Sequence, residues 1–184
     1  MSVPEGRERT HRRRFRPAAI GVCIALAALA TMWIYILFFA DTTNPNRVPD
    51  RAWATRAETT CKGYADQIKV LPDATMFADV KPKAEAMRQR AVVGRQVTDL
   101  LTAMVASLRA TPPTDAVSAD AVNRWLADYD TYLGDRHRHL EAWAAGEDPP
   151  FAETADGNRP LSIGMDDFAN ANNMTSCEVP GDLG

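Results

Sequence analysis

A run of 23 residues without a single charged side chain, from Ala18 to Ala40, constrains this chain more than any other feature. A helix rises about 1.5 Å per residue, so the run extends roughly 34 Å and can cross a hydrocarbon core of about 30 Å. In lipid, a helix satisfies all the backbone polar groups of such a segment internally. The sequence therefore predicts a transmembrane helix over residues 18–40.

Charged and aromatic residues on either side of this run indicate its orientation. Six arginines and two glutamates precede the run, whereas Asp41 and a nearly neutral stretch follow it. Because cytoplasmic flanks carry the excess of Lys and Arg, we expect residues 1–17 in the cytoplasm and all residues after position 40 outside. Trp33, Tyr35 and Phe39 lie where the outer interfacial belt of aromatic side chains forms in a spanning helix.

A removed leader is the alternative to a permanent anchor. Ala28-Leu29-Ala30 fits a small-x-small cleavage site after a short apolar core. A cut at that point would leave the sequence TMWIYILFF as a new N-terminus, and exposing this apolar segment to water is unfavourable. The sequence favours the retained anchor and leaves cleavage open.

The residues after position 40 form one acidic segment. Its 15 basic and 22 acidic residues give a formal charge of −7. A negative domain is repelled by polyanions and by anionic lipid headgroups, so we expect no nucleic-acid partner. The lipid bilayer is an expected partner of residues 18–40, while the acidic segment is long enough to bury a core of its own.

Two of the three cysteines predict a cross-link. Cys23 lies in the apolar run, whereas Cys61 and Cys177 lie in the segment expected outside. Paired cysteines in an oxidising compartment usually form disulfides, which predicts a Cys61–Cys177 bond. Two unrelated buried thiols are the alternative, since two distant cysteines without clustered histidines rarely bind a metal.

Apolar residues spaced three and four apart predict a helical domain. Residues 41–50 are polar, contain two prolines and read as a linker, and helices are expected over 51–70, 82–110 and 118–145. The heptad-like seam of the second helix faces either the domain's own core or a second copy of the chain, so a homo-oligomer stays open.

Turn and capping residues predict where these helices begin and end. Pro82 suits a first helical turn, Ser118 is the expected N-cap of the third helix, and Gly146 is its left-handed stop. Asp156-Gly157 signals a turn in an ordered loop or small hairpin, and residues 164–177 contain one or two helical turns. The expected fold is all-α: a transmembrane helix, then an extracytoplasmic bundle over residues 51–184 with a short final helix and an ordered loop or hairpin.

The densest group of titratable side chains, DRHRHLE at 135–141, predicts a solvated helix face. His137 and His139 are about 200° apart around a helix and cannot share a metal. No twelve-residue calcium loop or matched carboxylate pair is present, so we expect no metal and no cofactor. Several aspartates are interpreted as solvated or capping groups, with Asp166 or Asp167 on the first turn of the last helix: Asp128, Asp130, Asp135, Asp166 and Asp167.

Aromatic side chains and one asparagine complete the candidate residues. Asn172 is the first choice for a buried amide that braces the tail to the bundle. The aromatic residues are expected in the core, and a groove for a ligand or a partner peptide is their functional alternative. The candidate groove residues are Trp53, Tyr64, Trp125, Tyr129, Trp143 and Phe168.

Two stretches carry a resemblance. WLADYDTYLGDRHRHLEAW at 125–143 and DDFANANNMTSCEVPGD at 166–182, together with Cys61, resemble a family of uncharacterised actinobacterial single-pass membrane proteins. In that family a cysteine near the anchor and a late FA..N.M..C motif flank a helical domain. The resemblance implies the architecture and no particular activity.

The expected function is that of a membrane-anchored accessory module that binds another envelope protein. A small-ligand-binding domain is the alternative. An enzyme comes third, because the sequence contains neither a Gly-x-Ser-x-Gly motif nor a glycine-rich phosphate loop, and both outer cysteines are assigned to a cross-link.

Overall fold

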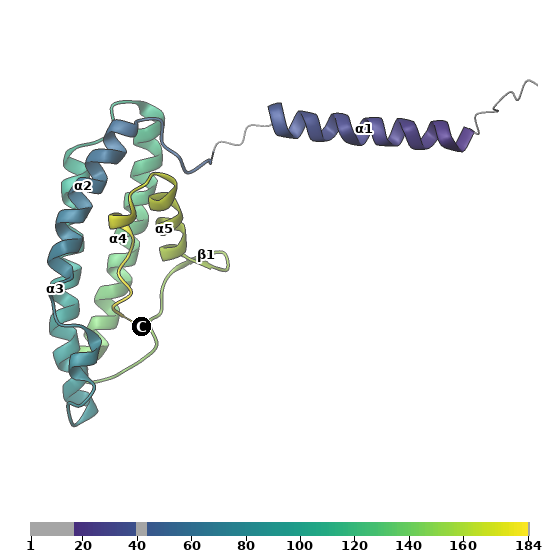
Figure 1. Ribbon diagram of the computed structural model, residues 1–184. Helices are drawn as coiled ribbons and strands as arrows, with labels where there is room; N and C mark the ends of the chain where they lie inside the picture. The colour runs from purple at the N-terminus through teal and green to yellow at the C-terminus, as the bar shows by residue number, and fades with distance from the viewer. Residues whose placement is uncertain (1–16, 40–43, 184) are drawn as a thin grey trace, which may run out of the picture. The chain divides into compact units, whose positions relative to one another are not determined.

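The computed structural model describes residues 17–39 and 44–183, which form two compact units divided between Thr43 and Asn44 (Figure 1). The first unit contains one apolar helix and the second contains a helical domain. Only two short strands occur in the described part of the chain, so the predicted all-α class is confirmed.

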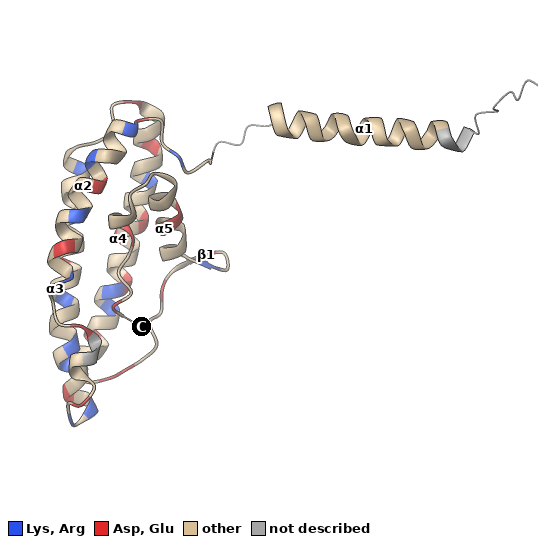
Figure 2. Cartoon of the chain, in the orientation of Figure 1, with Lys and Arg blue, Asp and Glu red and all other residues tan. Residues whose placement is uncertain are grey.

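Helix α1, Pro17–Phe39, makes up the described part of the first unit. Figure 2 shows no charged residue along it, and its stretch Ile20–Phe38 is long and apolar enough to cross a membrane. Trp33 and Tyr35 lie in its C-terminal half, as predicted, and are exposed. Ala40, the expected end of the span, lies outside the described residues, as do residues 1–16 and 41–43 of the predicted tail and linker.

Three long helices build the second unit (Figure 1). The two longest, α3 and α4, form a helical hairpin; α2 packs on α3, and the short helix α5 packs on α4. A two-stranded antiparallel hairpin precedes α5, and two 3-10 turns complete the unit. The elements are α2 (Arg51–Ile68), η1 (Ala74–Phe77), α3 (Lys83–Ala110), α4 (Ala116–Ala145), β1 (Ala155–Asp156), β2 (Arg159–Pro160), α5 (Leu161–Ala171) and η2 (Thr175–Cys177).

The two ends of α4 confirm one predicted capping residue and correct the other. Gly146 has a φ of 86° and ends the helix in the left-handed conformation, as predicted. Ser118, by contrast, is not the N-cap, because α4 begins earlier: Asp115 accepts the backbone N–H of Ser118 at 2.8 Å. The Ser118 hydroxyl instead accepts the backbone N–H of Asp50 at 3.0 Å, which ties the start of α4 to the start of α2.

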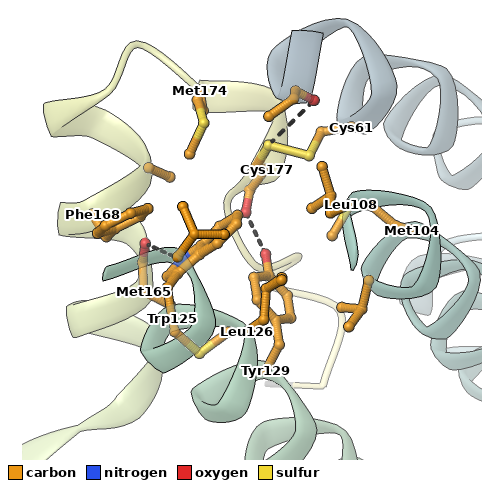
Figure 3. Packing of buried hydrophobic residues seen from close by; sticks show 14 of the residues in the cluster. Cys61, Met104, Leu108, Trp125, Leu126, Tyr129, Met165, Phe168, Met174 and Cys177 are labelled. Carbon is orange, nitrogen blue, oxygen red and sulfur yellow. Dashed lines mark hydrogen bonds between the residues drawn. A yellow bond between two sulfur atoms is a disulfide. The ribbon is translucent and has the colours of Figure 1, made fainter. Parts of the chain in front are cut away.

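The hydrophobic core consists of two clusters along the α3–α4 hairpin. The larger one gathers side chains from α2, α3, α4, α5 and the C-terminal turn (Figure 3). The smaller one lies between the N-terminal half of α3 and the C-terminal half of α4, and Leu183 completes it. Near that end Gly94 lets the two helices approach closely, since a Cβ there would overlap the Leu140 side chain.

The predicted Cys61–Cys177 disulfide is present and joins α2 to the C-terminal turn, with a Cα–Cα distance of 5.0 Å. Both cysteines are completely buried. The Tyr129 hydroxyl of α4 donates a hydrogen bond to the Cys177 carbonyl (Figure 3). The C-terminal segment is therefore fastened to two helices at one residue.

Asn172 braces the tail, as predicted, and it also holds the start of the domain. Its Oδ1 accepts the backbone N–H of Val48 and a guanidinium N–H of Arg51, both at 2.9 Å. Its Nδ2 donates to the carbonyls of Asn46 at 2.7 Å and Phe168 at 2.9 Å. Because Val48 is buried, the second half of the predicted linker belongs to the folded domain rather than to a free connection.

We predict that replacing Cys61 or Cys177 by serine lowers the free energy of unfolding by about 4–5 kcal/mol, because the bond closes a loop of more than a hundred residues. Chemical denaturation of the two single variants and the double variant measures this change. The double variant should be no less stable than either single variant. Losses that add would mean that the two sulfurs stabilise the fold independently.

We also predict that Asn172→Leu lowers the free energy of unfolding by about 2–4 kcal/mol, since it leaves several buried polar groups without a partner. Asn170→Ala is the matched control. The Asn170 side chain is exposed and only donates to the Asp166 carbonyl, so its loss should cost less than about 0.5 kcal/mol. Equal effects in thermal melts would contradict the brace.

Candidate binding cleft

A cleft lies between α4, α5 and the β1–β2 hairpin. It consists of two hollows of about 280 and 200 Å³, and both hollows are lined by Asp128, Arg159 and Gly164. We call it the α4–α5 cleft and define it by its polar lining and its glycine: Asn46, Arg124, Asp128, Asp156, Arg159 and Gly164.

Two stacked aromatic rings form the floor of the α4–α5 cleft. The ring centroids of Trp125 and Phe168 are 5.1 Å apart and their planes differ by 26°. The indole N–H of Trp125 donates to the Met165 carbonyl at 3.1 Å, which fixes the ring between α4 and α5 (Figure 3). Both side chains are more than nine-tenths buried, so the floor is rigid and presents only small parts of the two rings.

The two arginines at the cleft already have partners. Arg124 pairs with Asp120 one turn earlier on α4, and Arg159 pairs with Asp167 on α5. These four side chains are exposed, so each pair contributes little to stability. The pairs nevertheless neutralise both arginines at the rim of the cleft.

The two carboxylates at the cleft, Asp128 and Asp156, have no such partners among the described residues. Within the described residues, neither Asp128 nor Asp156 forms a side-chain hydrogen bond or an ion pair. Asp128 is half-buried, and this burial, together with the negative charge of Asp156, raises the pKa of its carboxyl group. A carboxylate in this position is stabilised by any cation that enters the cleft.

Gly164 leaves space on the cleft side of α5. A Cβ built on this residue would meet no atom within 4 Å. An isolated glycine inside a helical pattern commonly has a packing or functional reason. Gly164 is not among the residues singled out from the sequence, although an isolated glycine in a helical pattern is a local signal that can be read from it.

The structure brings only two of the six candidate groove residues to the cleft, namely Trp125 and Phe168. Trp53 and Tyr129 are buried in the larger core cluster, and Trp143 belongs to the smaller one. Tyr64 is half-buried, with its hydroxyl 2.8 Å from the Ser107 hydroxyl. The core interpretation of these aromatics therefore describes them better than a shared groove does.

The prediction of a solvated face at 135–141 is wrong for three residues. Asp135, Arg136 and His139 are buried, because the chain after α4 folds back over this side of the helix. Asp135 accepts the backbone N–H of Thr154 at 2.6 Å, and the two nitrogens of the Arg136 fork each lie 2.7 Å from an oxygen of Asp182.

The other aspartates singled out by sequence lie in several environments. Asp130 is exposed and pairs with Arg109. Asp166 does not hold the first turn of α5 but lies in the middle of the helix, where its carboxylate accepts the backbone N–H of Val179 at 2.9 Å. Its role is to attach the tail, which continues after the disulfide. Asp167 pairs with Arg159 at the cleft.

His139 is buried against Trp143 and Phe151, with ring-centroid distances of 4.5 and 5.3 Å. Its Nε2 has no hydrogen-bond partner. Burial lowers the pKa of the imidazole, because a charged ring would lose hydration in this apolar surrounding. The charged groups that act on it are Asp148, Arg90, Arg136 and Asp182.

A separate hollow of about 350 Å³ lies between α2, α3 and the C-terminal turn. Leu101 and Met104, both buried, form part of its wall. Lys69, Ser176 and Glu178 contribute its polar lining. Its apolar wall and few polar groups are typical of a small-ligand site at the lower end of the usual size range.

Comparisons with protein-family models, with curated proteins and with solved structures each return no match for this chain. Residues 17–39 and 44–183 contain no group of three or more His, Cys, Asp or Glu side chains that could hold a metal ion. The geometry of the sites themselves is therefore the evidence that bears on function.

We predict that the domain loses stability as the pH falls through about 6.5, and that His139→Phe removes this loss. The pKa of His139 is lower in the folded state than in the unfolded state, so the neutral ring stabilises the fold fully at pH values above the unfolded-state pKa. This stabilisation is lost as the pH falls and the unfolded chain takes up the proton. Denaturant midpoints from neutral pH to about pH 5 measure this loss of stability. The exposed His137 provides the control, and His137→Phe should keep the response of the natural chain.

Proposed function

We propose that this chain is a membrane-anchored binding module whose helical domain lies outside the cytoplasmic membrane and recognises another envelope protein through the α4–α5 cleft. The observation that carries the proposal is the cleft itself: the carboxylates of Asp128 and Asp156, which have no partner among the described residues, line its smaller hollow, and Asp128 also lines the larger hollow beside Trp125 and Phe168. The buried aromatic floor is pre-organised for recognition, because it loses little conformational freedom when a partner binds.

Two features support the location. Helix α1 is long and apolar enough to anchor the chain, and the arginines before it favour a cytoplasmic N-terminus. The buried Cys61–Cys177 bond suits an oxidising compartment, where disulfides form and persist. The same arrangement accords with the resemblance carried by residues 125–143 and 166–182.

A small-ligand-binding domain is the second candidate function. The hollow of about 350 Å³ beside the disulfide favours it, since apolar side chains from two helices line the hollow and Lys69 and Glu178 lie at it. An amphipathic molecule would place its apolar part against Leu101 and Met104 and its polar part near these charges.

We predict that a photo-crosslinking amino acid at Asn158 captures another envelope protein in native membranes. Asn158 lies in the hairpin turn between two cleft-lining residues, Asp156 and Arg159, and leaves both of them in place. Mass spectrometry of the crosslinked species identifies the partner. The same amino acid at Val92, an exposed position on α3, provides the control and should not capture it.

A bulky residue in the cleft provides the second part of this test. Gly164→Trp should abolish capture from Asn158, because the new side chain enters the open space next to α5. Gly63→Trp adds the same side chain to α2, also at a position with no atom within 4 Å, and should leave capture unchanged. Equal capture from Asn158 and Val92, or capture that Gly164→Trp does not affect, would overturn the proposal.

A further inference from the structure

We infer that the α4–α5 cleft receives a basic side chain, Lys or Arg, from an extended segment of the partner protein. This inference rests on the proposed function and names the chemistry of its partner. The charges that line the cleft, the burial of one of them and the aromatic floor each support it.

The charges at the cleft are net negative when the two carboxylates that pair with its arginines are counted with the lining residues. Arg124 and Arg159 are neutralised by Asp120 and Asp167. Asp128 and Asp156 have no such partners among the described residues. Both of these carboxylates line the smaller hollow, where the negative charge of Asp156 acts on Asp128. A cation entering the hollow would therefore relieve the repulsion between them.

The position of Asp128 favours a hydrogen-bond donor as well as a charge. Its carboxylate is half-buried beside the buried Trp125 and accepts no hydrogen bond from the described residues. A partly desolvated carboxylate without donors is less stable than one that accepts N–H bonds. An ammonium or guanidinium group supplies both the donors and the positive charge in one side chain.

The floor suits the aliphatic stem of such a side chain. Methylene groups of Lys and Arg pack on apolar surface while the charged end stays hydrogen-bonded. Trp125 and Phe168 provide aromatic surface at the larger hollow, and Gly164 leaves the path to Asp128 open.

An acidic partner fits less well, even though two arginines line the cleft. Each guanidinium already has one carboxylate partner, so it attracts a second anion less strongly than an unpaired arginine would. The incoming anion would also be repelled by Asp128 and Asp156, which line the smaller hollow together with Arg159. The cleft therefore selects by repulsion as well as by attraction.

The test is a titration of the full chain in lipid nanodiscs with three short peptides that differ at one position. Each is an acetylated and amidated alanine peptide with lysine, norleucine or glutamate at its centre. The NMR signals of the Trp125 indole N–H and of the Gly164 amide report binding. We expect the lysine peptide to bind about tenfold more tightly than the norleucine peptide, and the glutamate peptide not to bind.

Charge variants assign the effect to the cleft. Asp128→Asn should weaken binding of the lysine peptide about fivefold, and Asp156→Asn should weaken it less. Asp99→Asn is the matched control, because it makes the same charge change at an exposed position on α3 and should leave the affinity unchanged. Gly164→Trp should abolish binding without changing either carboxylate.

Equal binding of the lysine and norleucine peptides, a preference for glutamate, or no shift with the lysine peptide at millimolar concentration would overturn the inference. So would an equal loss of affinity in Asp128→Asn and Asp99→Asn. These outcomes are separate from the crosslinking result. Capture from Asn158 without a lysine preference would support the proposed function and overturn the inference of a basic side chain. A lysine preference without capture would support a cleft that binds basic side chains and overturn the proposed envelope-protein partner.

Discussion

The attachment of the C-terminal segment to the helical hairpin is the constraint on which the rest of the domain depends. Helix α5 has only 11 residues, and a helix of this length is marginal in water without tertiary packing. The Cys61–Cys177 bond and the Asn172 amide hold its C-terminal side, while Asp166 attaches the tail. Because α5 and the strand hairpin form one wall of the cleft, the cleft exists only while these attachments are made.

Much of this framework follows from the sequence, because helices, their stops and one cross-link have local or compartment-dependent signals. The extents of α2 and α3, the Gly146 stop and the hairpin at Asp156-Gly157 all follow from spacing and turn chemistry. The start of α4 was misplaced, since Asp115 and Ser118 are both good caps and only the contact with Asp50 distinguishes them.

The cleft and the buried charges were not predictable in the same way. Asp135 and Arg136 look like members of a solvated face, and only the returning chain, with Thr154 and Asp182, covers them. The cleft likewise combines residues from four segments, so the spacing of apolar residues within one helix cannot predict it. Buried ion pairs of this kind add little net stability, but they fix which tail residue lies where.

The open space beside Gly164 affects which substitutions selection can accept on this surface. Alanine there would meet no neighbouring atom and would favour the helical state by about 0.5–1 kcal/mol, so the present residue keeps α5 weaker than it needs to be. Stability and an open cleft thus favour different residues at one site. A single substitution at this position can narrow the α4–α5 cleft while making the protein harder to unfold, so a screen for thermostable variants would select chains in which this cleft is closed.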